Sequence, residues 1–131
     1  MGCAAALAAI RVYEEDRLVE RARETGRVMK QLLAELAAKH PSVGAVRSIG
    51  LFGIVELVRD RKTREPLAPY NGTSEEMAAL ARFFREEGLY TMVRWNAFYA
   101  NPPLTITEAQ LREAFAIVDR GLEITDRAVR A

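Results

Sequence analysis

The chain has 131 residues, enough for one domain with a hydrophobic core, and its 50% hydrophobic and 28% charged content is ordinary for a globular protein. Its 19 basic and 18 acidic residues are mixed along the sequence, so no basic stripe is available to neutralise a nucleic-acid backbone. No apolar run approaches the ~20 residues that span a bilayer, and a single cysteine excludes an internal disulfide. We therefore expect one folded unit in the cytoplasm that binds neither nucleic acid nor a membrane.

The first forty residues predict two successive helices. Residues 3–13 are rich in alanine, the strongest helix former, and Asp16 occupies a position suited to the N-cap of the second helix. This second helix is amphipathic, because side chains that are apolar at all positions but one recur at steps of three or four. The positions are Leu18, Ala22, Thr25, Met29, Leu32 and Leu36. The pattern ends before Pro41, since proline disfavours helix at the residue that precedes it.

The middle of the chain predicts one strand and a third helix. Residues 46–58 are apolar at nearly every position and rich in β-branched and aromatic side chains, which favours a strand covered on both faces. Residues 59–66 are highly charged and predict a solvated loop. Thr73 and Glu76 have the spacing of a capping box, so the third helix is expected over residues 74–87.

The last third of the chain predicts a hairpin and a final helix. Short strands at residues 89–93 and 98–100 flank a turn. Thr107 and Gln110 form a second capping box before the last helix. The order of elements is helix, helix, strand, helix, strand, strand, helix. This mixture indicates an α+β fold in which a small antiparallel sheet packs with helices.

Few side chains suggest chemistry by their spacing. His40 lies at a helix end without a catalytic partner close in sequence, which favours a surface helix terminus over a catalytic base. Cys3 sits among alanines, which favours a packed side chain over a reactive thiol. Glu56 lies inside the apolar strand, and pairing with a neighbouring arginine is favoured over acid–base catalysis. No set of residues has the spacing of a metal site.

Arg94 is the strongest candidate for a binding residue. It lies at the tip of a predicted hairpin, beside Trp95 and Asn96. A guanidinium in that position can hold a carboxylate through two parallel hydrogen bonds. Spacing alone still favours a surface hairpin over an anion site.

Three stretches of the sequence are informative when taken together: residues 3–10, residues 43–57 with the segment VRSIGLFGIVEL, and residues 88–107 with the segment NPPLTIT. In this order they resemble class III aminotransferases, specifically the branch that transfers amino groups from ω-amino acids to pyruvate. The resemblance extends from Cys3 to the end of the chain. It implies the C-terminal small domain of a fold-type I enzyme that depends on pyridoxal phosphate.

The resemblance also implies a division of the chain. Residues 1–14 correspond to a helix between domains, left from the junction with a large domain, and residues 15–131 to the small domain. In the family this region follows a Gly-His-Pro segment, whereas here the sequence opens with Met1-Gly2, so we expect the cofactor-binding large domain to be absent. The apolar face of the first helix, with Leu7 and Ile10, should then be uncovered by the chain's own core.

The family's residues that bind the cofactor all belong to the large domain. They are the Schiff-base lysine, the aspartate at the pyridine nitrogen, the aromatic residue on the ring and the partner subunit's threonine. Lys30, Lys39 and Lys62 do not match the lysine motif. The resemblance therefore implies pyridoxal 5'-phosphate in the full-length enzyme, no cofactor on this chain alone and no catalytic residue within it.

Arg94 matches the family position whose arginine binds the substrate carboxylate and swings aside for uncharged substituents, although Trp95 departs from the usual neighbour. The implied reaction moves an amino group between an ω-amino acid or amine and a keto acid such as pyruvate. The implied partners are the missing large domain, these small molecules and a second subunit in a homodimer. The alternative is a stand-alone α+β binding or interaction module without catalysis.

Overall fold

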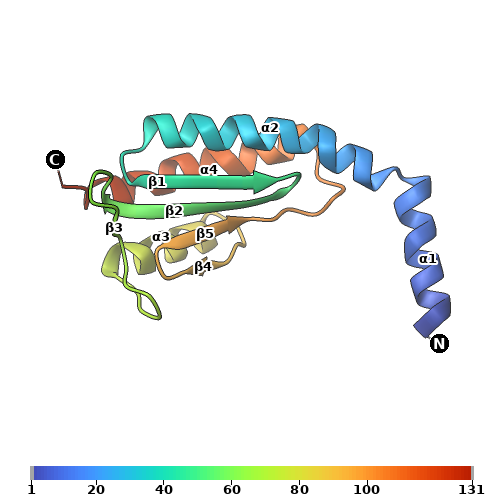
Figure 1. Ribbon diagram of the computed structural model, residues 1–131, viewed down its shortest axis with the longest axis horizontal. Helices are drawn as coiled ribbons and strands as arrows, with labels where there is room; N and C mark the ends of the chain where they lie inside the picture. The colour runs from blue at the N-terminus through green and yellow to red at the C-terminus, as the bar shows by residue number, and fades with distance from the viewer. Residues whose placement is uncertain (1, 131) are drawn as a thin grey trace.

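The structure is a computed structural model that describes residues 2–130. Within these residues the sheet is antiparallel, its strands lie in the order β1-β2-β5-β4, and β3 pairs with the end of β2 (Figure 1). The α+β fold expected from the sequence is confirmed. The elements are α1 (Gly2–Glu15), α2 (Leu18–Lys39), β1 (Val43–Ile49), β2 (Phe52–Asp60), β3 (Glu65–Pro66), α3 (Glu75–Glu86), β4 (Val93–Arg94), β5 (Ala97–Ala100) and α4 (Glu108–Asp126).

One face of the sheet carries the core. Helices α2, α3 and α4 form a layer against that face, and side chains from all of them join one hydrophobic cluster with β2 and β5 (Figure 1). Along β2, Val55 and Leu57 are fully buried whereas Ile54 and Glu56 are only partly covered. This alternation is that of a strand with one covered face. The prediction of a strand covered on both faces is therefore wrong for this chain.

The predicted single strand over residues 46–58 is also wrong, because the chain turns in its middle. β1 and β2 form an antiparallel hairpin, and Gly50 adopts a left-handed φ of 53° in the connecting turn. Leu51 in the same turn is 4% exposed. A buried apolar residue in the turn makes the sequence read as one continuous apolar run, which conceals the reversal.

The turn between β1 and β2 packs directly on α2. A Cβ placed on Gly26 would lie 2.7 Å from the Cα, C and O atoms of Gly50. Real Cβ atoms do not approach backbone that closely, so helix and turn could not keep this contact if residue 26 carried a side chain. Gly26 is therefore required for close packing in spite of its low helix propensity.

We predict that Gly26→Ala destabilises the chain by about 2 kcal/mol, because overpacking against backbone outweighs the ~1 kcal/mol that alanine gains in helix propensity. Urea unfolding followed by circular dichroism measures the change. Arg27→Ala, at the neighbouring exposed position of the same helix, is the matched control and should stay within about 0.5 kcal/mol of the parent chain. A stabilising Gly26→Ala would contradict the close contact.

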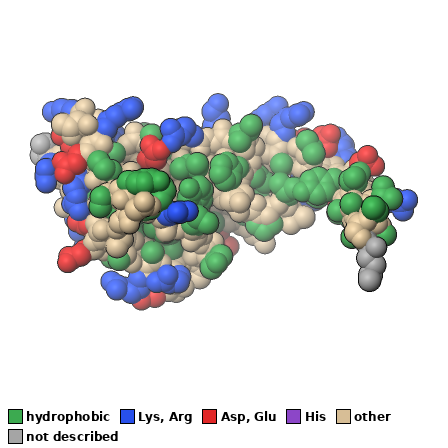
Figure 2. Space-filling model, turned by 60° about the horizontal axis from the view of Figure 1, so that its bottom comes forward, with side chains coloured by type: hydrophobic (Ala, Val, Ile, Leu, Met, Phe, Trp, Pro, Cys, Tyr) green, Lys and Arg blue, Asp and Glu red, His purple; other side chains and the backbone are tan. Residues whose placement is uncertain are grey.

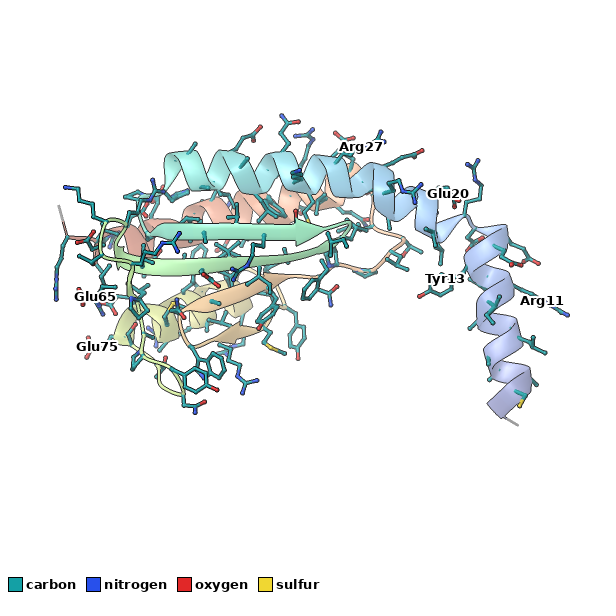
Figure 3. The ribbon with its side chains drawn as sticks, viewed as in Figure 1. Arg11, Tyr13, Glu20, Arg27, Glu65 and Glu75 are labelled. Atoms are coloured by element: carbon teal, nitrogen blue, oxygen red, sulfur yellow. The ribbon has the colours of Figure 1, made fainter. Side chains whose placement is uncertain are left out.

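Helix α1 projects away from the rest of the domain (Figure 1). None of its described residues is buried, and Leu7 and Ile10 are 58% and 53% exposed. Figure 2 shows hydrophobic side chains along this projecting helix, and Figure 3 shows Tyr13 on the side that faces the domain and Arg11 on the opposite side. The expected exposure of its apolar face is confirmed. Cys3 is exposed as well, so its interpretation as a packed side chain is wrong.

Helix boundaries follow the predictions more closely than the caps do. Thr107 and Gln110 form the predicted capping box at α4. At α3 the N-cap is Ser74, whose hydroxyl accepts a hydrogen bond from the Met77 N–H, so the predicted box with Thr73 is wrong. Asp16 does not cap α2, because the residue before the helix is Arg17, which has a left-handed backbone conformation.

No helix in residues 2–130 is long and apolar enough to cross a membrane.

The charged segment after β2 is more ordered than a solvated loop. Strand β2 continues to Asp60, and β3 pairs with its end. Arg59 forms a partly buried ion pair with Glu76 of α3 at 3.0 Å. Its hydrogen bonds to Glu76 hold the pKa of that carboxyl below the usual value. The segment therefore ties the sheet to α3, and the loop predicted over residues 59–66 is partly wrong.

Candidate functional site

The hairpin formed by β4 and β5 is fixed to the central strand β2. Asn96, in its turn, makes two hydrogen bonds with Leu57: its carbonyl accepts from the Leu57 N–H at 2.7 Å, and its side-chain amide donates to the Leu57 carbonyl at 3.1 Å. Trp95, the first of the two residues between the strands, has a left-handed φ of 55°. The predicted hairpin is confirmed, but its first strand covers only Val93–Arg94, so the strand predicted over residues 89–93 is wrong for residues 89–92. The two hydrogen bonds with Leu57 anchor its turn to the sheet.

Arg94 lies at this tip with an exposed side chain. Its guanidinium carbon is 4.5 Å from the centroid of the Trp95 ring, within the range of a cation–π contact. The Trp95 ring in turn contacts Tyr70, with 4.4 Å between ring centroids. No carboxylate in residues 2–130 forms an ion pair with Arg94. The N–H groups of Arg94 are therefore available to an external anion.

An apolar pocket of about 630 Å³ lies beside the hairpin. It is enclosed by residues 89–92, strand β5 and helix α4, and Tyr90, Phe98 and Pro103 are among its lining side chains. No charged residue lines it, and Arg94 is not part of its wall. A pocket without an acid, base or metal ligand in its lining does not by itself define a site for chemistry.

His40 is not at the surface. Its side chain is 1% exposed, and both ring nitrogens contact aspartates of α4: Nδ1 lies 2.7 Å from Asp126 and Nε2 lies 3.0 Å from Asp119. Both ring nitrogens are thus engaged within the chain, so the imidazole has no free nitrogen to offer a substrate. The prediction of a surface histidine without partners is wrong.

The same cluster fixes the end of α2 to α4. Ser42 donates from its hydroxyl and its backbone N–H to the Asp126 carboxylate at 2.6 and 3.0 Å. Lys39 pairs with Asp119, and this hydrogen bond is the main reason that the pKa of Asp119 lies below its usual value. Arg61 donates to the His40 carbonyl at 2.6 Å. Every buried polar side chain in residues 2–130 has a partner, which is typical of a structural network.

Sequence reasoning missed this network because its members come from distant segments. His40 and its two aspartates are separated by 79 and 86 residues. One signal was present: Asp119 and Asp126 lie about two helical turns apart on α4, so they share a face. Nothing in their spacing pointed to a histidine at the end of another helix.

The other candidates have ordinary surroundings. Glu56 forms an ion pair across the strands with Arg47, as predicted. Lys30 and Lys62 are exposed, and Lys39 is already paired with Asp119. No group of metal-binding side chains occurs in the part of the chain that the structure describes. Arg94 therefore remains the one predicted site residue with free hydrogen-bonding capacity at a fixed position.

Comparison with known proteins gives a consistent result. Residues 1–122 match the family model described as aminotransferase class-III. The chain is 35% identical over 121 residues to the 5-aminovalerate aminotransferase DavT of Pseudomonas aeruginosa, covering 90% of the chain and 27% of the relative. It is 32% identical over 125 residues to a probable 4-aminobutyrate aminotransferase of Bacillus subtilis, covering 93% and 27%.

Solved structures agree with the sequence matches. The chain superposes with a TM-score of 0.88 and 33% identity on taurine:2-oxoglutarate aminotransferase from Bifidobacterium kashiwanohense, in complex with PLP and glutamate. That match covers 95% of this chain and 28% of the other. The chain thus spans about a quarter of the length of these relatives. On the extent of the family match and the agreement of the fold, the chain belongs to the class III aminotransferases.

Proposed function

We propose that this chain is the C-terminal small domain of a pyridoxal-phosphate-dependent transaminase that moves an amino group between an ω-amino acid or amine and a keto acid such as pyruvate. In this proposal residues 15–131 belong to the small domain, and residues 1–14 belong to the segment that joins it to a large domain. The relatives named for 4-aminobutyrate, 5-aminovalerate and taurine support this substrate class. Each of these amino donors carries an acidic group remote from its amine.

The exposed and unpaired guanidinium of Arg94 is the observation that supports the proposal. It is an exposed guanidinium on a hairpin anchored to β2, without an acidic partner among residues 2–130. A planar guanidinium binds a carboxylate through two parallel hydrogen bonds, which selects acidic substrates and orients them. In this proposal Arg94 holds the acidic group of the substrate while the amino group reacts elsewhere in the enzyme.

The described residues do not fit the cofactor itself. Pyridoxal phosphate serves as an electron sink and requires a lysine, a partner for the pyridine nitrogen and a phosphate site. Lys30 and Lys62 lie in solvent, while Lys39 is engaged by Asp119. We therefore assign the cofactor and the catalytic residues to a large domain. In this proposal the large domain also covers the exposed face of α1. We expect the complete enzyme to be a cytoplasmic homodimer.

The first test asks whether the chain alone reacts with the cofactor. We predict that the purified chain mixed with pyridoxal phosphate shows no stoichiometric lysine adduct by absorbance and no transamination of β-alanine with pyruvate. Borohydride reduction followed by peptide mapping is the sensitive measurement. Stoichiometric labelling of Lys30, Lys39 or Lys62 would overturn the assignment of the cofactor to another domain.

The second part of the test joins the chain to the large domain of a class III relative. The joined protein should transaminate ω-amino acids, because the family's lysine is then present. A joined protein that folds and binds the cofactor, yet has no activity with any ω-amino acid or amine, would favour the stand-alone binding module instead.

A further inference from the structure

We propose that Trp95 is a positioning residue that holds the Arg94 guanidinium flat and leaves its edge free for the acidic group of the substrate. The inference rests on the proposed role of Arg94 and adds a determinant of specificity next to it. Three features of the described structure carry it: a fixed indole, a guanidinium over its ring, and free donors at the edge of that guanidinium.

The turn that carries Trp95 is anchored to the sheet, and its indole contacts a second ring. Asn96 anchors the turn to β2 through its two hydrogen bonds with Leu57, at 2.7 and 3.1 Å. Tyr70, from the loop between β3 and α3, packs on the Trp95 ring with centroids 4.4 Å apart and an interplanar angle of 49°. Trp95 has a φ of 55°, which is unfavourable for a bulky residue. Backbone strain of this kind occurs where surrounding contacts enforce a conformation, often at functional positions.

The central carbon of the Arg94 guanidinium lies over the indole, 4.5 Å from the ring centroid. The N–H donors of arginine lie in the plane of the group and point outward from its edge. In the arrangement that we propose, the guanidinium lies parallel to the ring, which leaves those donors free for a carboxylate in the same plane. Stacking on the indole and binding of an anion are compatible, so Trp95 can position Arg94 for the substrate.

The benefit is pre-organisation. Arginine has a long flexible side chain, and binding a carboxylate restricts it at an entropic cost. A guanidinium that already rests on a fixed ring loses less freedom when the substrate binds. A cation–π contact at an exposed site corresponds to an effect of about 2- to 5-fold on an equilibrium.

The experiment compares four variants of the enzyme that contains this chain: Trp95→Leu, Trp95→Phe, Arg94→Ala and the Arg94→Ala/Trp95→Leu double variant. We expect Trp95→Leu to raise KM for β-alanine about 2- to 5-fold, with kcat retained and with no change for an uncharged amine. Trp95→Phe should recover most of the loss, since it keeps an aromatic face. In the Arg94→Ala background, Trp95→Leu should have no further effect on β-alanine.

Other outcomes decide against the inference in distinct ways. Equal losses for β-alanine and the uncharged amine would assign Trp95 a structural role. A lower KM for β-alanine in Trp95→Leu would mean that the indole draws the arginine away from the substrate. If Arg94→Ala is selective for acidic substrates and Trp95→Leu has no effect, the inference fails and the proposed function survives. If Arg94→Ala impairs acidic and uncharged substrates equally, the proposed role of Arg94 is wrong, and the inference about Trp95 is wrong with it.

A spectroscopic measurement on the chain itself covers the case in which Trp95→Leu does not fold. Trp95 is the single tryptophan of the sequence, so its emission reports on this site alone. Arg94→Ala should change the intensity or wavelength of that emission, because it removes the cation from the ring face. Arg85→Ala, at an exposed position on α3, is the matched control and should change neither. An emission spectrum unaltered by Arg94→Ala would overturn the stacked arrangement.

Discussion

Replacing His40 with alanine is expected to lower the free energy of unfolding of this chain by about 3 kcal/mol. The imidazole is 1% exposed and bridges Asp119 and Asp126 on α4. Each hydrogen bond to a charged group contributes roughly 1.5–3 kcal/mol. Both carboxylates retain some access to water, with side chains 32% and 22% exposed, so the loss should lie near the lower end of the summed range.

Urea unfolding monitored by circular dichroism gives this free energy, and its slope checks that the same surface is exposed in each variant. Arg112→Ala serves as the control, since it removes only an exposed ion pair with Glu108 one helical turn away. That control should change stability by less than about 0.5 kcal/mol. A loss below about 1 kcal/mol for His40→Ala would mean that the buried network is not a major stabilising feature.

Local signals predicted the helices well. The recurring apolar positions of α2 and α4 mark the faces that enter the core, and the capping box of Thr107 and Gln110 marks the start of α4. Such signals depend on neighbours within one turn of helix, so they can be read from the sequence. The cap at α3 was displaced by one residue to Ser74, because adjacent threonine and serine residues can both serve as N-caps.

The β1–β2 hairpin shows where local reading fails. The reversal at Gly50 depends on packing against Gly26, which lies on another element. The buried side chain of Leu51 keeps the apolar run unbroken through the turn. A turn that lacks the usual polar residues cannot be recognised from the alternation of apolar and polar residues or from the composition typical of turns.

The candidate site was predictable only in part. The hairpin and the exposed arginine followed from local spacing, but the role of Arg94 came from resemblance to a family. The support of Trp95 by Tyr70, and of the turn by Leu57, joins residues that no local pattern connects. The burial of His40 was missed for the same reason, since both of its partners lie near the other end of the chain.

The second large effect concerns Arg94→Ala in the complete enzyme. Removing one partner of a desolvated charge pair costs about 2–5 kcal/mol, which corresponds to roughly 30- to 4,000-fold in kcat/KM for an acidic substrate. An uncharged amine never uses the guanidinium and should lose much less. Arg94 is exposed and has no ion-pair partner among residues 2–130, so its removal should leave the fold intact.

The ratio of kcat/KM for β-alanine to that for an uncharged amine, measured in the parent enzyme and in Arg94→Ala, tests the central claim most directly. Arg85→Ala controls for the loss of an exposed positive charge elsewhere on the domain. We predict that the ratio falls at least 30-fold in Arg94→Ala and does not change in Arg85→Ala. A ratio that stays constant, because both substrates lose activity equally, would remove Arg94 from the substrate site.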